Sequence, residues 1–203
     1  MRNRALLALV ALCAMTAYGC SDTRDSLLAP SGQRKAEIVS IDKGPAIERT
    51  VVPIVLRPTP LSQDYSVTQQ IGKAGGFITI PEAGFALYIP ENALTPPSKR
   101  KTVDITVTAL RGPNVAYTFE PHGLVFRTPV YAVQDARVTN AHLPDGTLSA
   151  ARGAYFADDA DILPGSGTIS EFQQTYLDSK ESRYFWVINH FSGYLLATDR
   201  SRY

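Results

Sequence analysis

The sequence predicts an all-β protein: an antiparallel β-sandwich of about ten short strands, preceded by a signal peptide and a flexible tether. Beyond Thr50 apolar and polar residues alternate, which is the spacing of a strand with one buried face. Turn-forming residues separate these segments, and the chain holds 14 Gly, 14 Pro, 10 Tyr and 8 Phe. Hydrophobic residues make up 44% of the 203 residues and charged residues 19%, so a packed core is expected and wholesale disorder is excluded.

The alternation is clearest in Val103–Ala109, where odd-numbered residues are apolar and the residues between them are polar. The other predicted strands are Val51–Leu56, Ser66–Ile71, Phe77–Ile80, Phe85–Ile89, Tyr117–Phe119, Val130–Gln134, Gly153–Phe156, Tyr184–Ile188 and Tyr194–Thr198. Pro53 indicates an edge strand, because proline has no N–H to donate to a second neighbour. A helix is plausible only over Glu171–Asp178, where Thr175 and Tyr176 oppose it.

The N-terminus has the pattern of an export signal. Arg2 and Arg4 precede an apolar run over Ala5–Ala17. Thirteen helical residues reach only about 20 Å, short of the roughly 30 Å hydrocarbon core of a membrane, so the run is interpreted as a signal-peptide h-region. It ends in Ala17-Tyr18-Gly19-Cys20, which resembles a bacterial lipobox. The resemblance implies cleavage after Gly19 and lipid on the thiol and amino group of Cys20; the alternative is an ordinary signal peptide that contains a cysteine.

Removal of residues 1–19 changes the formal charge from +1 to −1, because Arg2 and Arg4 leave with the signal. This balance makes no electrostatic case for nucleic acid. Cys13 also leaves and Cys20 carries lipid, so no cysteine remains for a disulfide or a thiolate metal site. Acyl chains on Cys20 would hold the protein at a membrane. Ser21, where inner-membrane lipoproteins of enteric bacteria carry Asp, favours the outer membrane of the cell envelope.

Three regions follow from this pattern. Residues 1–19 are the predicted signal peptide, and residues 20–49 comprise the lipidated cysteine and a flexible tether rich in polar residues, Gly and Pro. Within the tether, Leu27-Leu28 and Ile38–Ile41 are apolar enough to dock locally as a short ordered patch. Residues 50–203 form the predicted sandwich domain.

Three motifs of this domain occur in a recognisable order. The first is a double-glycine turn and strand, Gly75–Ile80, followed by the corner Ile89-Pro90-Glu91-Asn92-Ala93-Leu94. A threonine-rich strand follows at Val103–Thr108. The last is a segment with the spacing Tyr117, Phe119, Pro121, Gly123, Phe126, Pro129 and Val130. Together these motifs resemble the ZU-five domain, found in ankyrins, netrin receptors, tight-junction scaffolds and self-cleaving death-domain proteins.

The resemblance implies a β-sandwich that serves as a binding or linking module. The sequence departs from the family pattern at Asn92, where glycine is usual, but asparagine tolerates positive φ better than most residues. The sequence shows no death domain or ankyrin repeats, so the particular partners of the eukaryotic members do not carry over.

Near the C-terminus, His190-Phe191-Ser192 resembles the site at which some ZU-five relatives cut their own backbone between Phe and Ser. On a strand His190 and Ser192 project to the same face, so the imidazole could take the hydroxyl proton while the oxygen attacks the Phe191 carbonyl. Such cleavage needs a strained peptide, which Gly193 could permit. In the alternative interpretation Gly193 marks a bulge and His190 makes an ordinary structural hydrogen bond.

No metal site or cofactor is predicted. His122 and His142 have no ligand at metal-binding spacing, and Asp158, Asp159 and Asp161 lack the pattern of a calcium loop and are interpreted as a solvated loop. We find no phosphate loop, dinucleotide fingerprint or nucleophile elbow, which argues against an enzyme acting on an external substrate.

The function that these observations favour is a lipid-anchored, non-enzymatic binding module at the cell envelope. Its expected partners are the membrane, through Cys20, and an unidentified envelope protein or glycan. The alternatives are a module that cleaves itself between Phe191 and Ser192, and a passive structural lipoprotein. An exposed patch of tyrosines would favour binding, because amphipathic aromatic side chains are enriched at recognition surfaces.

Overall fold

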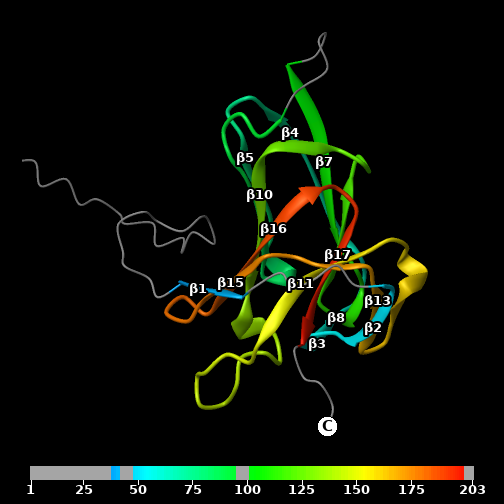
Figure 1. The fold of residues 1–203 in the computed structure, drawn as a ribbon, viewed down its shortest axis with the longest axis vertical. Helices are drawn as coiled ribbons and strands as arrows, with labels where there is room; N and C mark the ends of the chain where they lie inside the picture. The colour runs from blue at the N-terminus through cyan, green and yellow to red at the C-terminus, as the bar shows by residue number, and fades with distance from the viewer. Residues whose placement is uncertain (1–37, 42–47, 95–100, 199–203) are drawn as a thin grey trace, which may run out of the picture.

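The computed structural model describes residues 38–41, 48–94 and 101–198, which form an all-β protein (Figure 1). Two six-stranded antiparallel sheets pack as a sandwich, so the predicted fold class is confirmed. The predicted signal peptide, Cys20 and much of the predicted tether lie outside the described residues. Within those residues no helix has the length and apolar character needed to cross a membrane.

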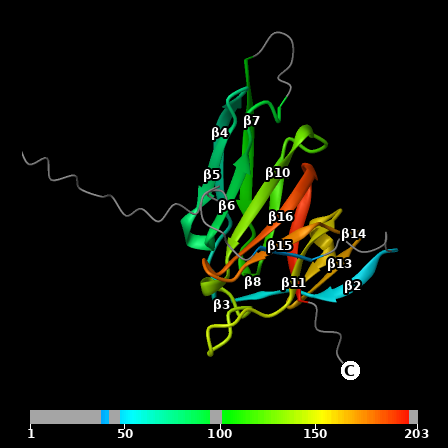
Figure 2. The ribbon, with the colours of Figure 1, turned by 60° about the vertical axis from the view of Figure 1, so that its left-hand side comes forward.

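The first sheet has the strand order β1-β15-β16-β10-β6-β5. Its strands are β1 (Ile38–Ile41), β15 (Thr175–Asp178), β16 (Arg183–His190), β10 (Val125–Asp135), β6 (Phe85–Ile89) and β5 (Gly76–Ile80). Figure 2 shows β5, β6, β10, β16 and β15 side by side.

The second sheet has the order β14-β11-β17-β9-β7-β4. Its strands are β14 (Glu171–Phe172), β11 (Ala151–Phe156), β17 (Gly193–Thr198), β9 (Ala116–Glu120), β7 (Thr102–Ala109) and β4 (Tyr65–Gly72). On the outer side of this sheet the hydroxyls of Thr68 and Thr106 are hydrogen-bonded at 2.7 Å.

Two small sheets lie at the lower end of the sandwich in Figures 1 and 2. One has the order β12 (Ile162–Leu163), β13 (Ser166–Ile169) and β2 (Thr50–Pro53), and the other pairs β3 (Leu56–Leu61) with β8 (Gly112–Asn114). Three short 3-10 helices connect strands: η1 (Pro81–Ala83), η2 (Ala136–Val138) and η3 (Asp159–Asp161).

The core lies between the inner faces of the two large sheets, and the alternation of β7 shows how it forms. Ile105 and Val107 are fully buried, whereas Thr106 between them is half-buried. Phe85 of the first sheet stacks on Tyr117 of the second, with ring centroids 4.0 Å apart. Each large apolar side chain buried in this way stabilises the fold by about 1.5–3 kcal/mol.

Gln134 is a fully buried polar residue at the edge of this core. Its Nε2 donates to the carbonyl oxygens of Ala83 and Asp135, each at 3.0 Å, and its Oε1 accepts from the Tyr117 hydroxyl. Donors and acceptors are therefore matched, which removes most of the cost of burying the amide.

Nine of the ten predicted strands are confirmed in position. The predicted strand Val51–Leu56 was wrong as a single strand: it covers β2 and only the first residue of β3, because Ile54 leaves the β13 ladder and bridges to Ala197 of β17. The rest of β3 was not predicted. As predicted from Pro53, β2 is an edge strand. Asn92 takes φ +62°, as expected for an asparagine that makes this corner in place of a glycine.

The helix considered over Glu171–Asp178 was wrong: the segment forms β14 and β15, whose partners are β11, β16 and β1. The short strands β8, β12 and β13 were not predicted, because segments of two to four residues carry too little alternation. Ile38–Ile41, inside the predicted tether, forms β1 and pairs with β15.

Candidate functional site

Four aromatic side chains lie on the outer face of the first sheet: Phe77, Tyr88, Tyr131 and Tyr176, here called the tyrosine face. Phe77 on β5 is paired with Tyr88 on β6, which is paired with Tyr131 on β10. The Phe77 and Tyr88 rings are 4.8 Å apart at an interplanar angle of 25°, and the Tyr88 and Tyr131 rings are 6.4 Å apart at 22°. All four residues are half-buried, so part of each side chain contacts solvent.

A buried apolar cluster lies beside the tyrosine face, on the same side of the first sheet. Ala86, Val133 and Phe185 are directly opposite one another on β6, β10 and β16, and each is at most 5% exposed. Tyr176 of β15 packs against this cluster and is paired with Phe185. Of the four aromatic side chains, Tyr176 is therefore packed against buried residues, and the positions of all four are set by the strand register.

The four side chains of the tyrosine face are all aromatic and include no carboxylate, ammonium or guanidinium group. Burial raises the pKa of Tyr131 above its ordinary value, and the neighbouring Tyr176 and Tyr88 raise it further. Each of Val133, Phe185 and Tyr176 has a charged residue two positions away on its own strand. These are Asp135, Arg183 and Asp178, which the strand register places opposite one another. A row of charged residues, each at most 8% exposed, thus lies beside the aromatic side chains on the same sheet.

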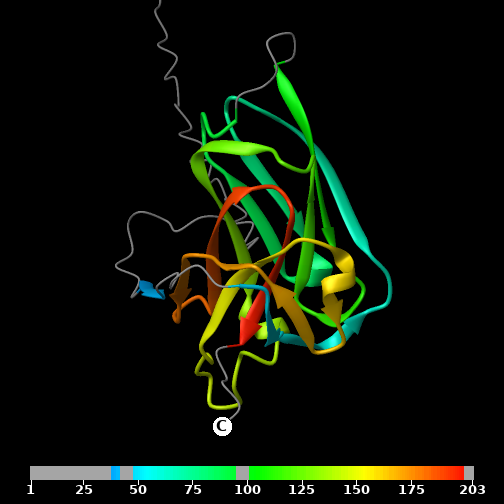
Figure 3. The same cartoon turned by 45° about the vertical axis from the view of Figure 1, so that its right-hand side comes forward.

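The predicted cleavage site lies where the chain crosses between the two sheets. β16 ends at His190 and β17 begins at Gly193, so Phe191 and Ser192 form the connection, which Figure 3 shows turning from β16 into β17 in the red part of the chain. The expectation that His190 and Ser192 lie on one strand was therefore wrong. The cause is the change of sheet, which ends the strand after His190.

Three backbone hydrogen bonds hold this connection. The Phe191 amide donates to the Leu124 carbonyl, and the Gly123 amide donates to the Phe191 carbonyl, each at 3.0 Å. The Phe119 amide donates to the Ser192 carbonyl, also at 3.0 Å. The Phe191 ring is buried, with the Phe119 ring 5.4 Å and the Phe126 ring 4.9 Å away.

The side chains around the connection make structural contacts. The half-buried His190 imidazole meets the Tyr155 ring edge-on at 5.2 Å, and the His190 carbonyl accepts from the Tyr194 hydroxyl at 2.7 Å. Burial raises the pKa of Tyr194, so this hydroxyl keeps its proton. Within the part of the chain that the structure describes, no hydrogen bond joins the His190 imidazole to the Ser192 hydroxyl, although Ser192 is 7% exposed.

Gly193 does not have the conformation that would indicate a strained peptide, since its φ lies outside the left-handed region. A β-carbon at residue 193 would instead lie 2.3 Å from Cε2 of Phe156. Glycine is required at this position because the Phe156 ring lies against the backbone. The structure therefore gives Gly193 a packing role, and the strained peptide that self-cleavage would need stays a prediction.

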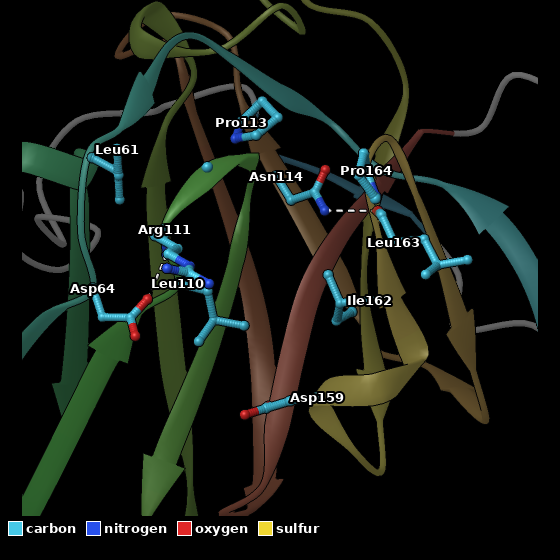
Figure 4. Close-up of a pocket in the computed structure, with 11 residues that line it drawn as sticks. Leu61, Asp64, Leu110, Arg111, Pro113, Asn114, Asp159, Ile162, Leu163 and Pro164 are labelled. Carbon is cyan, nitrogen blue, oxygen red and sulfur yellow. Dashed lines mark hydrogen bonds between the residues drawn. The ribbon is translucent and has the colours of Figure 1, made fainter.

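A surface pocket of about 650 Å³ lies at the lower end of the sandwich, between β8, β12 and the β3–β4 connection (Figure 4). The Asp64 carboxylate accepts from the Arg111 amide at 2.7 Å on one side. On the other side Asn114 joins the segments, donating to the Leu163 carbonyl at 2.8 Å and accepting from the Gly165 amide at 2.9 Å. These polar groups hold the loops together, and the arrangement has no feature of a catalytic site.

The remaining candidate residues lie in turns and loops. His122 is exposed in a turn before β10, and His142 forms an isolated bridge with Leu148. Asp158 caps η3 by accepting from the Ala160 amide, and Asp161 pairs with Arg49. Among the described residues no three His, Cys, Asp or Glu side chains are grouped so as to hold a metal ion.

Sequence reasoning could not find the tyrosine face, because it depends on which strands become neighbours. The signal that was present is local: Tyr88 lies between Leu87 and Ile89, and Tyr131 between Val130 and Ala132, at the outward positions of alternating strands.

No family model matches this chain, and no curated protein matches it. The likeness to the ZU-five domain therefore stays a prediction that rests on the motifs of the sequence.

Proposed function

We propose that this protein is a lipid-anchored β-sandwich of the cell envelope that acts as a binding module, and that the tyrosine face is its contact surface. The observation that carries the proposal is the alignment of half-buried aromatic side chains across adjacent strands of one regular sheet. The export signal and lipobox resemblance support the location, and the absence of known catalytic motifs from the sequence supports a non-enzymatic role.

The physical basis is the low entropic cost of using such side chains. Tyrosine combines a large apolar ring with a hydroxyl group and has only two side-chain torsions, so its immobilisation costs little. The neighbouring rings restrict these torsions for Phe77, Tyr88 and Tyr131, and the cluster of Ala86, Val133 and Phe185 restricts them for Tyr176. Binding energy from burying the rings is therefore largely retained.

The ring geometry favours a protein as the partner over a glycan. At 4.8 Å and a small interplanar angle, the faces of Phe77 and Tyr88 lie against each other, because rings side by side in one plane cannot approach so closely. Sugar rings stack on open aromatic faces, and these faces are partly covered. Ring edges and hydroxyls suit the mixed apolar and polar surface of a protein.

The test is affinity isolation of the tagged full-length protein from detergent-solubilised envelopes, followed by calorimetry with each enriched partner. We expect Tyr88→Ser/Tyr131→Ser to weaken binding at least tenfold. Ser66→Ala/Thr68→Ala, on the outer side of the second sheet, is the matched control and should bind as the wild type does. Equal binding by the tyrosine variant, or a partner that a tether-only fragment retains as well, would contradict the proposal. No saturable partner would favour the passive structural lipoprotein.

Self-cleavage is the second candidate function, and one contact favours it. The Gly123 amide donates to the Phe191 carbonyl, the oxygen that would gain negative charge during attack. The His190 imidazole would take the proton of the Ser192 hydroxyl while the Ser192 Oγ bonds to the Phe191 carbonyl carbon. The Phe191–Ser192 C–N bond then breaks, the amine takes the proton, and water hydrolyses the ester to a carboxylate and a free serine hydroxyl.

A further inference from the structure

Arg57 of β3 is a buried cation at the lower end of the sandwich, only 3% exposed. Its Nη1 donates to the Asn114 carbonyl. Its Nε and Nη2 are buried without a hydrogen-bond partner. These two nitrogens lie on the same edge of the planar guanidinium, which is the donor pair that matches a carboxylate.

The described residues supply no anion to this guanidinium. Ion pairs among them include Arg49 with Asp161, Arg137 with Asp135, and Arg183 with Glu181, and none of these involves Arg57. The guanidinium lies 5.4 Å from the centre of the Tyr117 ring. Burial raises the pKa of Tyr117 more than Arg57 lowers it, so the phenol stays neutral and does not serve as the counter-ion.

A pocket of about 640 Å³ adjoins Arg57, between β3, η1 and η2. Its lining is Arg57, Pro58, Thr59, Pro60, Leu61, Ser62, Tyr65, Glu82, Arg137 and Val138. The wall is therefore mixed: Pro58, Pro60, Leu61 and Val138 are apolar, Tyr65 is aromatic, and the other five side chains are polar or charged. Of the two other charged residues, Arg137 already pairs with Asp135 at 2.8 Å, whereas Glu82 is exposed.

We propose that this pocket binds a ligand carrying one carboxylate, which pairs with the free Nε–Nη2 edge of Arg57 while a short apolar part of the ligand lies against Pro58, Pro60 and Leu61. An unpaired buried charge is costly, and a bidentate carboxylate supplies both the missing charge and both missing acceptors. The two nitrogens are out of contact with solvent, so a side chain of the wall must shift to admit the carboxylate. The ligand can be a free carboxylic acid or the C-terminus of a peptide, which share this chemistry.

The test is calorimetry on the full-length protein in detergent micelles with four probes. These are hexanoate, its neutral isostere hexanamide, the peptide Ala-Ala-Leu-Leu with a free C-terminus, and the same peptide as a C-terminal amide. We expect saturable binding of hexanoate or the free-acid peptide and at least tenfold weaker binding of the matching amide. Tighter binding of the peptide acid than of hexanoate identifies a protein C-terminus as the source, and the reverse order identifies a small acid.

Variants assign the binding to this pocket. Arg57→Met should abolish binding and Arg57→Lys should weaken it at least tenfold, because ammonium cannot present the paired donors. Val138 lines the pocket and is 41% exposed, so Val138→Trp should fill the entrance without changing Arg57 and should also abolish binding. This variant keeps the test decisive if the Arg57 variants fail to fold. Glu82→Gln is the control and should bind at least as tightly as the wild type, because it removes a like charge beside the carboxylate.

Three outcomes would overturn the proposal: the acid and its amide bind equally, neither hexanoate nor the free-acid peptide shows saturable binding, or Val138→Trp binds as the wild type does. Because this pocket does not include the tyrosine face, Tyr88→Ser/Tyr131→Ser should leave hexanoate binding unchanged. The failure of either proposal is thus distinguishable from the failure of the other.

Discussion

The backbone of Gly193 lies directly against the aromatic ring of Phe156. A β-carbon at residue 193 would be 2.3 Å from Cε2 of that ring and 2.5 Å from Cζ. The two residues are paired across β17 and β11, and both are buried. The start of β17, directly after the predicted cleavage site, is therefore determined by close packing and not by backbone freedom.

Gly193→Ala should destabilise the fold by about 2 kcal/mol, because the added methyl group must displace a buried ring. Urea unfolding followed by tryptophan fluorescence measures this cost, since Trp186 is the one tryptophan of the chain. In a Phe156→Ala background the same substitution should cost much less, because the obstructing ring is gone. An equal cost in both backgrounds would show that the ring contact is not the reason for glycine.

Tyr184 should make the stability of the protein sensitive to alkaline pH. Burial raises the pKa of Tyr184 to about 12, and its hydroxyl donates to the Ser149 carbonyl. A tyrosine in the unfolded chain ionises near pH 10. The protonated Tyr184 hydroxyl therefore makes its full contribution to the free energy of unfolding below about pH 10, and this contribution is lost as the pH rises toward 12.

Tyr184→Phe isolates this effect. At pH 7 it should destabilise the protein by about 1 kcal/mol, through loss of the hydrogen bond to Ser149. Above about pH 10 the difference from the wild type should narrow, because only the wild type loses stability by ionising residue 184 in the unfolded state. Urea unfolding between pH 7 and 11 measures both values, and a difference that stays constant over this range would contradict the assignment.

The second candidate function predicts a specific mass. Cleavage between Phe191 and Ser192 would separate residues 192–203 covalently from the rest of the chain. The pairing of β17 with β11 and β9 would hold this piece in place until the protein is denatured. Intact mass spectrometry under denaturing conditions should then show two fragments for the wild type and one uncleaved chain for Ser192→Ala. A single uncleaved species in both proteins would exclude self-cleavage.

Lipidation of Cys20 is a prediction of the sequence alone. Cells grown with radiolabelled palmitate should incorporate label into the wild-type protein, and Cys20→Ala should lose it and leave the membrane fraction. Undiminished labelling of Cys20→Ala would reject the lipobox assignment, as would a wild-type protein recovered in the soluble fraction with residues 1–19 still attached.

Part of the site was within reach of sequence reasoning. Alternation places Tyr88 and Tyr131 on the outer side of their strands, because Leu87, Ile89, Val130 and Ala132 must face the core. That Phe77, Tyr88 and Tyr131 become neighbours depends on the order β10-β6-β5. The unpaired guanidinium of Arg57 was also beyond prediction, since an arginine between Leu56 and Pro58 is ordinarily expected at the surface.

The sequence by itself determined the class of fold, the positions of nine of the longer strands and the turn at Asn92. These follow from local physics, because the two-residue alternation decides which side of each strand is buried, and asparagine can adopt positive φ. Only the tertiary structure decided the strand order, the conversion of Glu171–Asp178 into strands, and the change of sheet after His190. Each of these depends on contacts between segments far apart in the chain, whose energies are not encoded in any one local pattern.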